Sequence, residues 1–120
     1  MFKTVNVGGK ELKFRASAQT SFLYKKIFNK DILAVLSNVK ESMDIDSILG
    51  LAYVMNLQAE NPKTLDDIMH GKVSEVSFLQ WLDDFEYTDL IDAEFISSVT
   101  DAWLRTTETS TKSKNQYRPQ

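Results

Sequence analysis

The sequence predicts an α+β domain that is mostly α, with an N-terminal β-hairpin packed on a compact bundle of about five helices and a disordered C-terminal tail. Gly8-Gly9 separates two runs with alternating apolar residues, apolar residues then recur at helical spacing to residue 106, and residues 107–120 are polar without periodicity. We therefore expect a single globular domain over residues 1–106, with the hairpin at 1–16 and the helices at 17–106, followed by a flexible polar tail at 107–120.

The composition is typical of a folded globular protein. The 120 residues are 42% hydrophobic and 26% charged, with only four glycines and two prolines. The absence of cysteine excludes disulfide and thiolate chemistry. The N-terminus lacks the apolar core of a signal peptide, and no unbroken apolar run apart from glycine exceeds the five residues of 51–55, which is too short to span a bilayer. We expect a soluble protein of the cytoplasm.

The charge is unevenly distributed along the chain. Residues 1–40 carry eight basic and two acidic side chains (net +6), residues 41–109 carry three basic and fifteen acidic side chains (net −12), and the last eleven residues carry three basic side chains (net +3). These regions are either ordinary solvated faces or surfaces that attract each other, within one molecule or head to tail between molecules.

The first elements are a hairpin and a short helix. Val5 and Val7 before the glycine pair, and Leu12 and Phe14 after it, predict two strands joined by a tight turn. The run "SAQTSFLYKKIFN" predicts a helix that places Leu23, Tyr24, Ile27 and Phe28 on one face and Lys25 and Lys26 on the other, with Ser17, Thr20 or Ser21 as its cap. Asp31 is the expected cap of a second short helix, "ILAVLSNV".

The most apolar segment is "DIDSILGLAYVMNLQAEN", whose circumference is apolar nearly all round, and we expect it to be the central helix. Asp44 or Asp46 is its expected cap, and Asn61-Pro62 ends it. One or two helical turns in "TLDDIMHGK" follow and close at Gly71.

Two amphipathic helices complete the domain. The first begins at Ser74 and presents Phe78, Trp81, Leu82 and Phe85 on one face. The second presents Ile91, Phe95, Val99, Ala102 and Trp103. The helical spacing favours a core position for Trp81 and Trp103, with a partner interface as the alternative.

No catalytic or metal-binding motif is present, and we expect neither an enzyme nor a cofactor. His70 is the only histidine and has no cysteine to complete a zinc site, and Ser74 and Ser77 are better explained as residues that begin a helix. The acidic stretch "DDFEYTDLIDAE" lacks the glycine and the alternating ligands of a calcium loop. It is either a solvated junction in which Asp89 or Asp92 caps the next helix, or a binding surface for a basic partner. The dispersed basic residues argue against nucleic-acid binding.

Two runs resemble a known family. The residues Tyr24, Lys25, Phe28, Lys30, Asp31 and Ile32, followed later by Phe78, Trp81, Leu82 and Phe85, are similar to paired runs in the tail assembly chaperones of long-tailed (siphovirus-type) bacteriophages and prophages of Gram-positive bacteria. The resemblance covers residues 1–106. It departs from the family at Asn29, where glycine is usual.

The resemblance implies a non-catalytic protein that binds the tape-measure protein, keeps it soluble and helps to recruit major tail (tube) subunits. It also implies self-association, a frameshift-extended second product in many members, action in the cytoplasm of the bacterial host, and absence from the mature virion. Without the resemblance, a small acidic interaction module, such as an adaptor or a DNA-mimic inhibitor, is the alternative. The candidate partner-binding residues are Lys25, Lys26, Lys30, Asp83, Asp84, Glu86 and Asp89.

Overall fold

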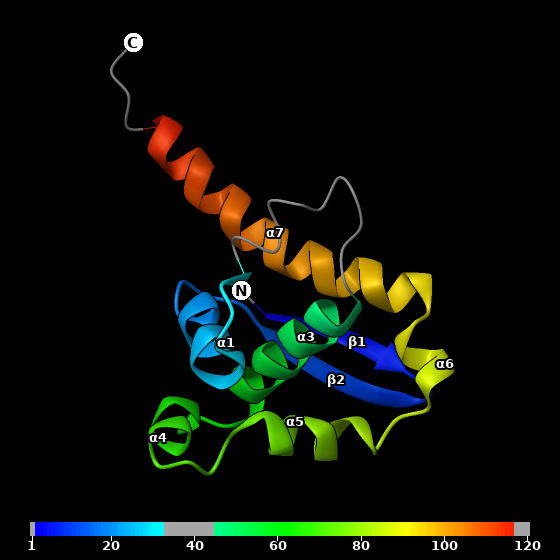
Figure 1. The fold of residues 1–120 in the computed structure, drawn as a ribbon. Helices are drawn as coiled ribbons and strands as arrows, with labels where there is room; N and C mark the ends of the chain where they lie inside the picture. The colour runs from blue at the N-terminus through cyan, green and yellow to red at the C-terminus, as the bar shows by residue number, and fades with distance from the viewer. Residues whose placement is uncertain (1, 33–44, 117–120) are drawn as a thin grey trace.

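The fold begins with an antiparallel hairpin of β1 (Phe2–Val7) and β2 (Lys10–Arg15) (Figure 1). The computed structural model describes residues 2–32 and 45–116, with side chains over 3–32 and 45–104. The strands pair from Val7↔Lys10 to Phe2↔Arg15 without a bulge. Gly8 and Gly9 have φ values of 55° and 86°, as a tight primed turn requires, so the predicted hairpin is confirmed.

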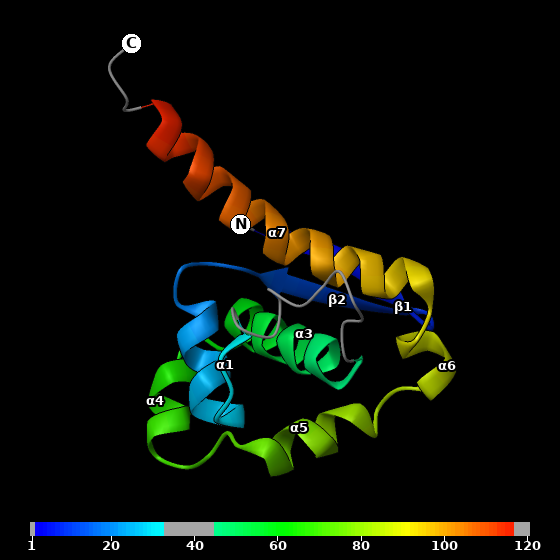
Figure 2. The ribbon, with the colours of Figure 1, turned by 45° about the horizontal axis from the view of Figure 1, so that its top comes forward.

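The hairpin has one apolar and one polar face. Val5, Val7, Leu12 and Phe14 are buried on the inner face, whereas every described side chain on the outer face, from Thr4 to Arg15, is exposed. Helix α3 (Ile45–Glu60) lies against β2, and helix α7 (Ala93–Gln116) lies against β1 (Figures 1 and 2). Both helices therefore cover the inner face, where the rings of Phe14 and Phe95 lie 6.3 Å apart.

Helix α3 is the centre of the molecule, as the sequence predicts. Every residue from Ser47 to Asn56 is buried, because the hairpin, α1, α5 and α7 surround this segment. The helix ends at Glu60, directly before Asn61-Pro62, as expected. The predicted cap is corrected in part: Asp46 lies inside the first turn and does not precede the helix, and Asp44 is outside the described residues.

Helix α1 (Thr20–Phe28) begins after a small hydrogen-bonded loop. The Ser17 N–H donates to Thr20 Oγ1 (2.9 Å), and the Gln19 N–H donates to Ser17 Oγ (3.2 Å). The helix ends at Asn29, which has a φ of 56° and whose N–H donates to the Lys25 carbonyl. Glycine adopts this left-handed conformation without strain and asparagine tolerates it. The second helix predicted after Asp31 lies outside the described residues beyond its first position.

Helices α4 (Thr64–Met69) and α5 (Glu75–Leu82) follow as predicted. Gly71, with a φ of 73°, closes the turn after α4. Ser74 caps α5, because its Oγ accepts from the Val76 N–H (3.3 Å) while Ser77 Oγ accepts from the Ser74 N–H (2.7 Å). Both serines therefore start the helix, as the sequence indicates.

The predicted last helix is divided into α6 (Tyr87–Leu90) and α7. Asp92 separates them, and its Oδ2 accepts from the N–H groups of Glu94 (3.1 Å) and Phe95 (3.4 Å). Asp92, rather than Asp89, is therefore the cap of α7. The placement of Ile91 on the apolar face is wrong: its side chain is 38% exposed, because α7 begins two residues later.

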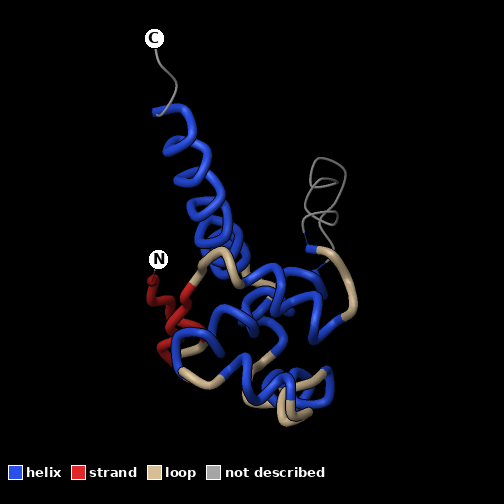
Figure 3. Tube along the Cα trace, turned by 90° about the vertical axis from the view of Figure 1, so that its left-hand side faces the viewer, coloured by secondary structure: helices blue, strands red, loops and turns tan. Residues whose placement is uncertain are grey.

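The end of α7 also corrects the sequence interpretation. The helix continues to Gln116, so residues 107–116 of the predicted tail are helical, and residues 117–120 lie outside the described part. No glycine or proline occurs between Asp92 and Pro119, so nothing in the backbone chemistry ends the helix sooner. Figures 1 and 3 show this part of α7 leaving the body of the molecule.

One core unites these elements, and the predicted α+β, mainly α-helical class is confirmed. Trp103 is 5% exposed and belongs to the core, as its spacing predicts. Trp81 is half-buried and packs against the edge of the core, where its indole N–H donates to Asn56 Oδ1 (3.2 Å).

Candidate partner-binding surfaces

A groove lined by aromatic and aliphatic side chains lies between α1, α3 and α5. It encloses about 290 Å³. We call it the aromatic groove, and its lining consists of Tyr24, Phe28, Lys30, Asp46, Ser47, Glu75, Phe78, Leu79 and Leu82. The two runs that carry the family resemblance therefore meet here, although about fifty residues of sequence separate them.

The aromatic rings of the groove are packed against one another. The ring centroids of Tyr24 and Phe28 are 4.7 Å apart, and Phe28 meets Phe78 edge-on at 5.1 Å. Tyr53 of α3 lies behind Phe78, with centroids 5.5 Å apart. Such tilted and edge-on pairs are the favoured aromatic geometries, so the floor of the groove is preformed.

Gly50 allows this packing, and sequence reasoning did not identify it. A β-carbon at this position of α3 would lie 3.1 Å from the Tyr24 ring and 3.2 Å from the Phe28 ring. Glycine inside a helix costs about 1 kcal/mol relative to alanine, so its presence here needs a packing reason. The close approach of α1 to α3 is that reason. An isolated glycine within an apolar helical run was the only signal in the sequence.

The rim of the aromatic groove is both apolar and charged. Leu79, on α5, is 62% exposed and gives the rim an apolar side chain. Lys30 stands on the rim with two carboxylates, Asp46 and Glu75. A groove with an apolar floor and charges of both signs at its edge can accept the apolar side chains of an amphipathic helix.

The predicted acidic residues lie around the turn of the hairpin. Asp83, Asp84, Glu86 and Asp89 line a hollow of about 250 Å³, which we call the turn cleft, together with Val7, Gly8, Lys10 and Phe85. The Lys10 ammonium donates to the Asp84 carbonyl (2.9 Å) and lies 5.2 Å from the centroid of the Phe85 ring. A basic residue of the same chain therefore reaches into this acidic region.

A second contact joins the basic front of the chain to its acidic body. Lys3 on β1 forms a salt bridge with Asp101 on α7, with an Nζ–Oδ2 distance of 3.0 Å. Attraction within one molecule, one of the two possibilities left open by the sequence, is therefore present at these positions. A partly exposed pair of this kind stabilises a protein by about 0–1 kcal/mol, so it orients α7 more than it stabilises the fold.

The three candidate lysines occupy different surroundings. Lys25 and Lys26 are exposed in the last turn of α1, where cations complement the helix dipole. Lys30 lies beyond the end of the helix and lines the aromatic groove. None of the three lines the turn cleft, so the structure does not bring the basic and acidic candidates into one site.

The described residues contain no group of three or more potential metal ligands, and His70 is exposed, with its Nδ1 3.4 Å from Asp66 Oδ1. Burial raises the pKa of Tyr53, and a hydrogen bond with Ser77 partly opposes this shift.

Among the helices described, none is long and apolar enough to cross a membrane.

Comparisons test whether the chain has recognisable relatives. No protein-family model, no curated protein and no solved structure matches it.

Proposed function

We propose that the chain is a non-catalytic tail assembly chaperone of a long-tailed bacteriophage or prophage of Gram-positive bacteria. In this proposal it binds the tape-measure protein, keeps it soluble in the cytoplasm of the bacterial host, and helps to recruit tail-tube subunits. A frameshift-extended form would carry the contact with those subunits, and neither form would remain in the mature virion. The observation that supports the proposal most is that both resembling runs build one aromatic groove.

The groove suits a long helical client. An amphipathic helix can place one apolar side chain in the space between Phe28, Phe78 and Leu79, while its polar flanks meet Lys30 and Glu75. Burial of one such side chain is worth about 1.5–3 kcal/mol, which gives only weak binding by itself. Many copies along one client would convert this weak contact into stable coating, because linked contacts add avidity.

The test is co-expression with a helical fragment of a tape-measure protein from the same phage genome. We expect the wild-type chain to raise the soluble fraction of the fragment. Leu79→Asp places a carboxylate in the apolar groove and is expected to abolish this effect. Val76→Asp is the matched control, because Val76 is an equally exposed side chain of α5 that does not line the groove.

Each result has a definite meaning. Circular dichroism first establishes that both variants are folded. Failure of the wild-type chain to solubilise the fragment would remove the main support for the proposal and leave the acidic interaction module as the better description. Equal loss in both variants would show that the aromatic groove is not the binding site.

A further inference from the structure

Strand β1 has a free edge. In the described part of the chain the sheet contains only β1 and β2, so the side of β1 that faces away from β2 has no strand beside it. The register begins with the Val7↔Lys10 pair that flanks the two-residue turn, which is a hydrogen-bonded pair in this kind of hairpin. Hydrogen-bonded and non-hydrogen-bonded pairs alternate along an antiparallel hairpin, so Asn6 and Thr4 are in non-hydrogen-bonded pairs. Their N–H and C=O groups therefore point away from β2.

This edge is unusually open. Both Thr4 and Asn6 are exposed, and β1 has neither a proline nor a bulge in its described pairing. Exposed edge strands normally carry such features, since unpaired backbone groups are a template for another strand. The one lysine whose side chain lies near the edge, Lys3, is held by Asp101.

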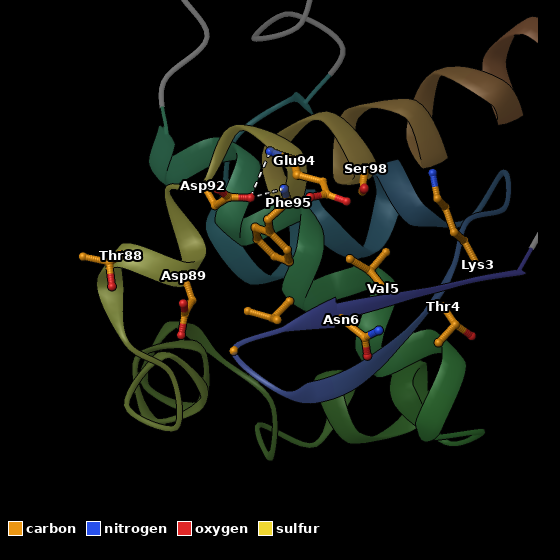
Figure 4. A pocket seen from close by; sticks show the side chains of 12 residues that line it. Lys3, Thr4, Val5, Asn6, Thr88, Asp89, Asp92, Glu94, Phe95 and Ser98 are labelled. Carbon is orange, nitrogen blue, oxygen red and sulfur yellow. Dashed lines mark hydrogen bonds between the residues drawn. The ribbon is translucent and has the colours of Figure 1, made fainter.

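A groove runs beside this edge (Figure 4). It encloses about 430 Å³ between residues 3–8 and the side chains of six residues in the segment 88–98, and we call it the edge groove. Asp92 and Glu94 line its far wall across from β1, and Asp89 lies at its end beside the hairpin turn (Figure 4). Lys3 is its only basic residue and already has a carboxylate partner, so the groove favours positive charge.

We propose that the edge groove binds an extended, lysine- or arginine-bearing segment of a partner protein, which adds to β1 as a third strand. The backbone groups of Thr4 and Asn6 supply the pairing, and the carboxylates of Asp89, Asp92 and Glu94 select the basic side chains. A second copy of β1 is a poorer occupant, because antiparallel pairing of two edges would bring both sets of these carboxylates to one interface. This surface is separate from the aromatic groove, so the two proposals stand or fall independently.

The test uses a synthetic peptide, acetyl-Lys-Thr-Lys-Thr-Lys-Thr-amide, titrated into the isotope-labelled full chain at low salt. We expect the amide resonances of Thr4 and Asn6 to shift and their hydrogen exchange to slow, because their outward N–H groups gain acceptors. The same peptide with glutamate in place of lysine is expected to bind at least about tenfold more weakly, a difference of about 1.4 kcal/mol. Added salt should weaken the binding of the lysine peptide, because it screens the attraction between opposite charges.

Two further comparisons test backbone pairing itself. Peptides N-methylated at all threonines or at all lysines lose alternate N–H donors, and only one of these sets faces β1. One methylated peptide should therefore bind about tenfold more weakly while the other binds nearly as the parent does. In the protein, Asn6→Pro removes an outward N–H that the hairpin does not use, whereas Asn6→Ala keeps it, so only the proline variant should lose binding.

The contrary results are equally distinct. The proposal would be overturned if the two methylated peptides bound equally well, or if the glutamate peptide bound as well as the lysine peptide. It would also be overturned if saturation with the lysine peptide left the amide resonances of Thr4 and Asn6 unchanged. A chain that ignores the peptide but forms a dimer that Asn6→Pro dissociates would replace the proposed occupant with a second copy. If Asn6→Pro fails to fold, the pair of methylated peptides still decides the matter.

Discussion

The carboxylate of Asp89 lies directly over the α-carbon of Gly8. A β-carbon added at Gly8 would collide with Asp89 Oδ2 and lie 3.0 Å from its Cγ, whereas one added at Gly9 would meet nothing within 4 Å. The two glycines therefore have different reasons to be glycine. Gly9 is needed for its backbone conformation alone, and Gly8 is needed both for its conformation and for the close approach of α6 to the hairpin turn.

This difference gives the first prediction. Alanine at either position must adopt a left-handed conformation, which costs about 1–2 kcal/mol. We expect Gly9→Ala to lower the free energy of unfolding by that amount, and Gly8→Ala to lower it by about 1 kcal/mol more, because Asp89 must move. Urea denaturation measures both. In an Asp89→Ala background, Gly8→Ala should lose only its additional destabilisation and become as costly as Gly9→Ala. Equal losses of stability for the two glycine substitutions in the wild-type background would contradict the geometry.

The second prediction concerns Asn56, a buried side chain of α3 that joins three elements. Its Nδ2 donates to the Lys13 carbonyl of β2 (3.0 Å), and its Oδ1 accepts from the Trp81 indole of α5 (3.2 Å). Asn56→Ala removes both bonds and leaves their partners unsatisfied, so the free energy of unfolding should fall by about 1–3 kcal/mol.

Asn6→Ala is the control for this measurement, because that asparagine is exposed on the hairpin and its substitution should change the stability by no more than about 0.5 kcal/mol. Tryptophan fluorescence during urea denaturation follows unfolding, because the half-buried Trp81 becomes exposed to solvent when the chain unfolds. A variant as stable as the wild type would show that the two hydrogen bonds contribute nothing net.

The third prediction follows from the raised pKa of Tyr53. Its phenol is buried, and desolvation raises the pKa above the usual 10.0 even though the Ser77 hydrogen bond lowers it. The unfolded chain therefore releases this proton first as the pH rises. Tyr53 therefore makes its full contribution to the free energy of unfolding below about pH 10, the pKa of tyrosine in the unfolded chain. That contribution is lost as the pH rises through the higher pKa of Tyr53 in the folded protein.

Stability should accordingly decline more steeply above about pH 10 in the wild type than in Tyr53→Phe, which has no phenol to ionise. Urea denaturation at a series of alkaline pH values compares the two proteins, and the other titrating groups are common to both. Parallel pH profiles would mean that the phenol reaches solvent in the folded state.

Local signals were sufficient to predict much of the fold. The Gly8-Gly9 pair, the Ser74 cap and the apolar circumference of α3 are each determined by neighbouring residues, and each prediction was confirmed. The errors lie at boundaries. Both Asp89 and Asp92 precede an apolar run, and only the packing of α6 against α7 determines that Asp92 is the cap.

For the candidate surfaces, the sequence allowed individual residues to be named, but not which of them lie together in the folded protein. Phe28 and Phe78 meet because α1 and α5 both pack on α3, and Gly50 permits that packing. The edge groove depends on the register of β1 and on where α7 begins, neither of which a hydrophobic pattern specifies. Contacts between segments distant in sequence require the tertiary structure.

The fourth prediction tests the self-association that belongs to the proposed function. Lys25 and Lys26 are exposed at the end of α1 and line none of the described hollows in which the chain's own acidic residues gather. If they meet the acidic surface of a neighbouring molecule, Lys25→Glu with Lys26→Glu should weaken self-association by at least about tenfold at low salt, because attraction becomes repulsion.

The matched control is Lys63→Glu with Lys72→Glu, which makes the same change in net charge at two other exposed lysines. Static light scattering over a range of concentrations and salt measures the molar mass of each protein. Attraction between opposite charges weakens as salt screens them, so the wild type should dissociate as salt is raised. A monomeric wild type at high concentration and low salt would end this part of the proposal. Equal weakening in both double variants would assign the effect to net charge, and Lys25 and Lys26 would then be ordinary solvated residues of α1.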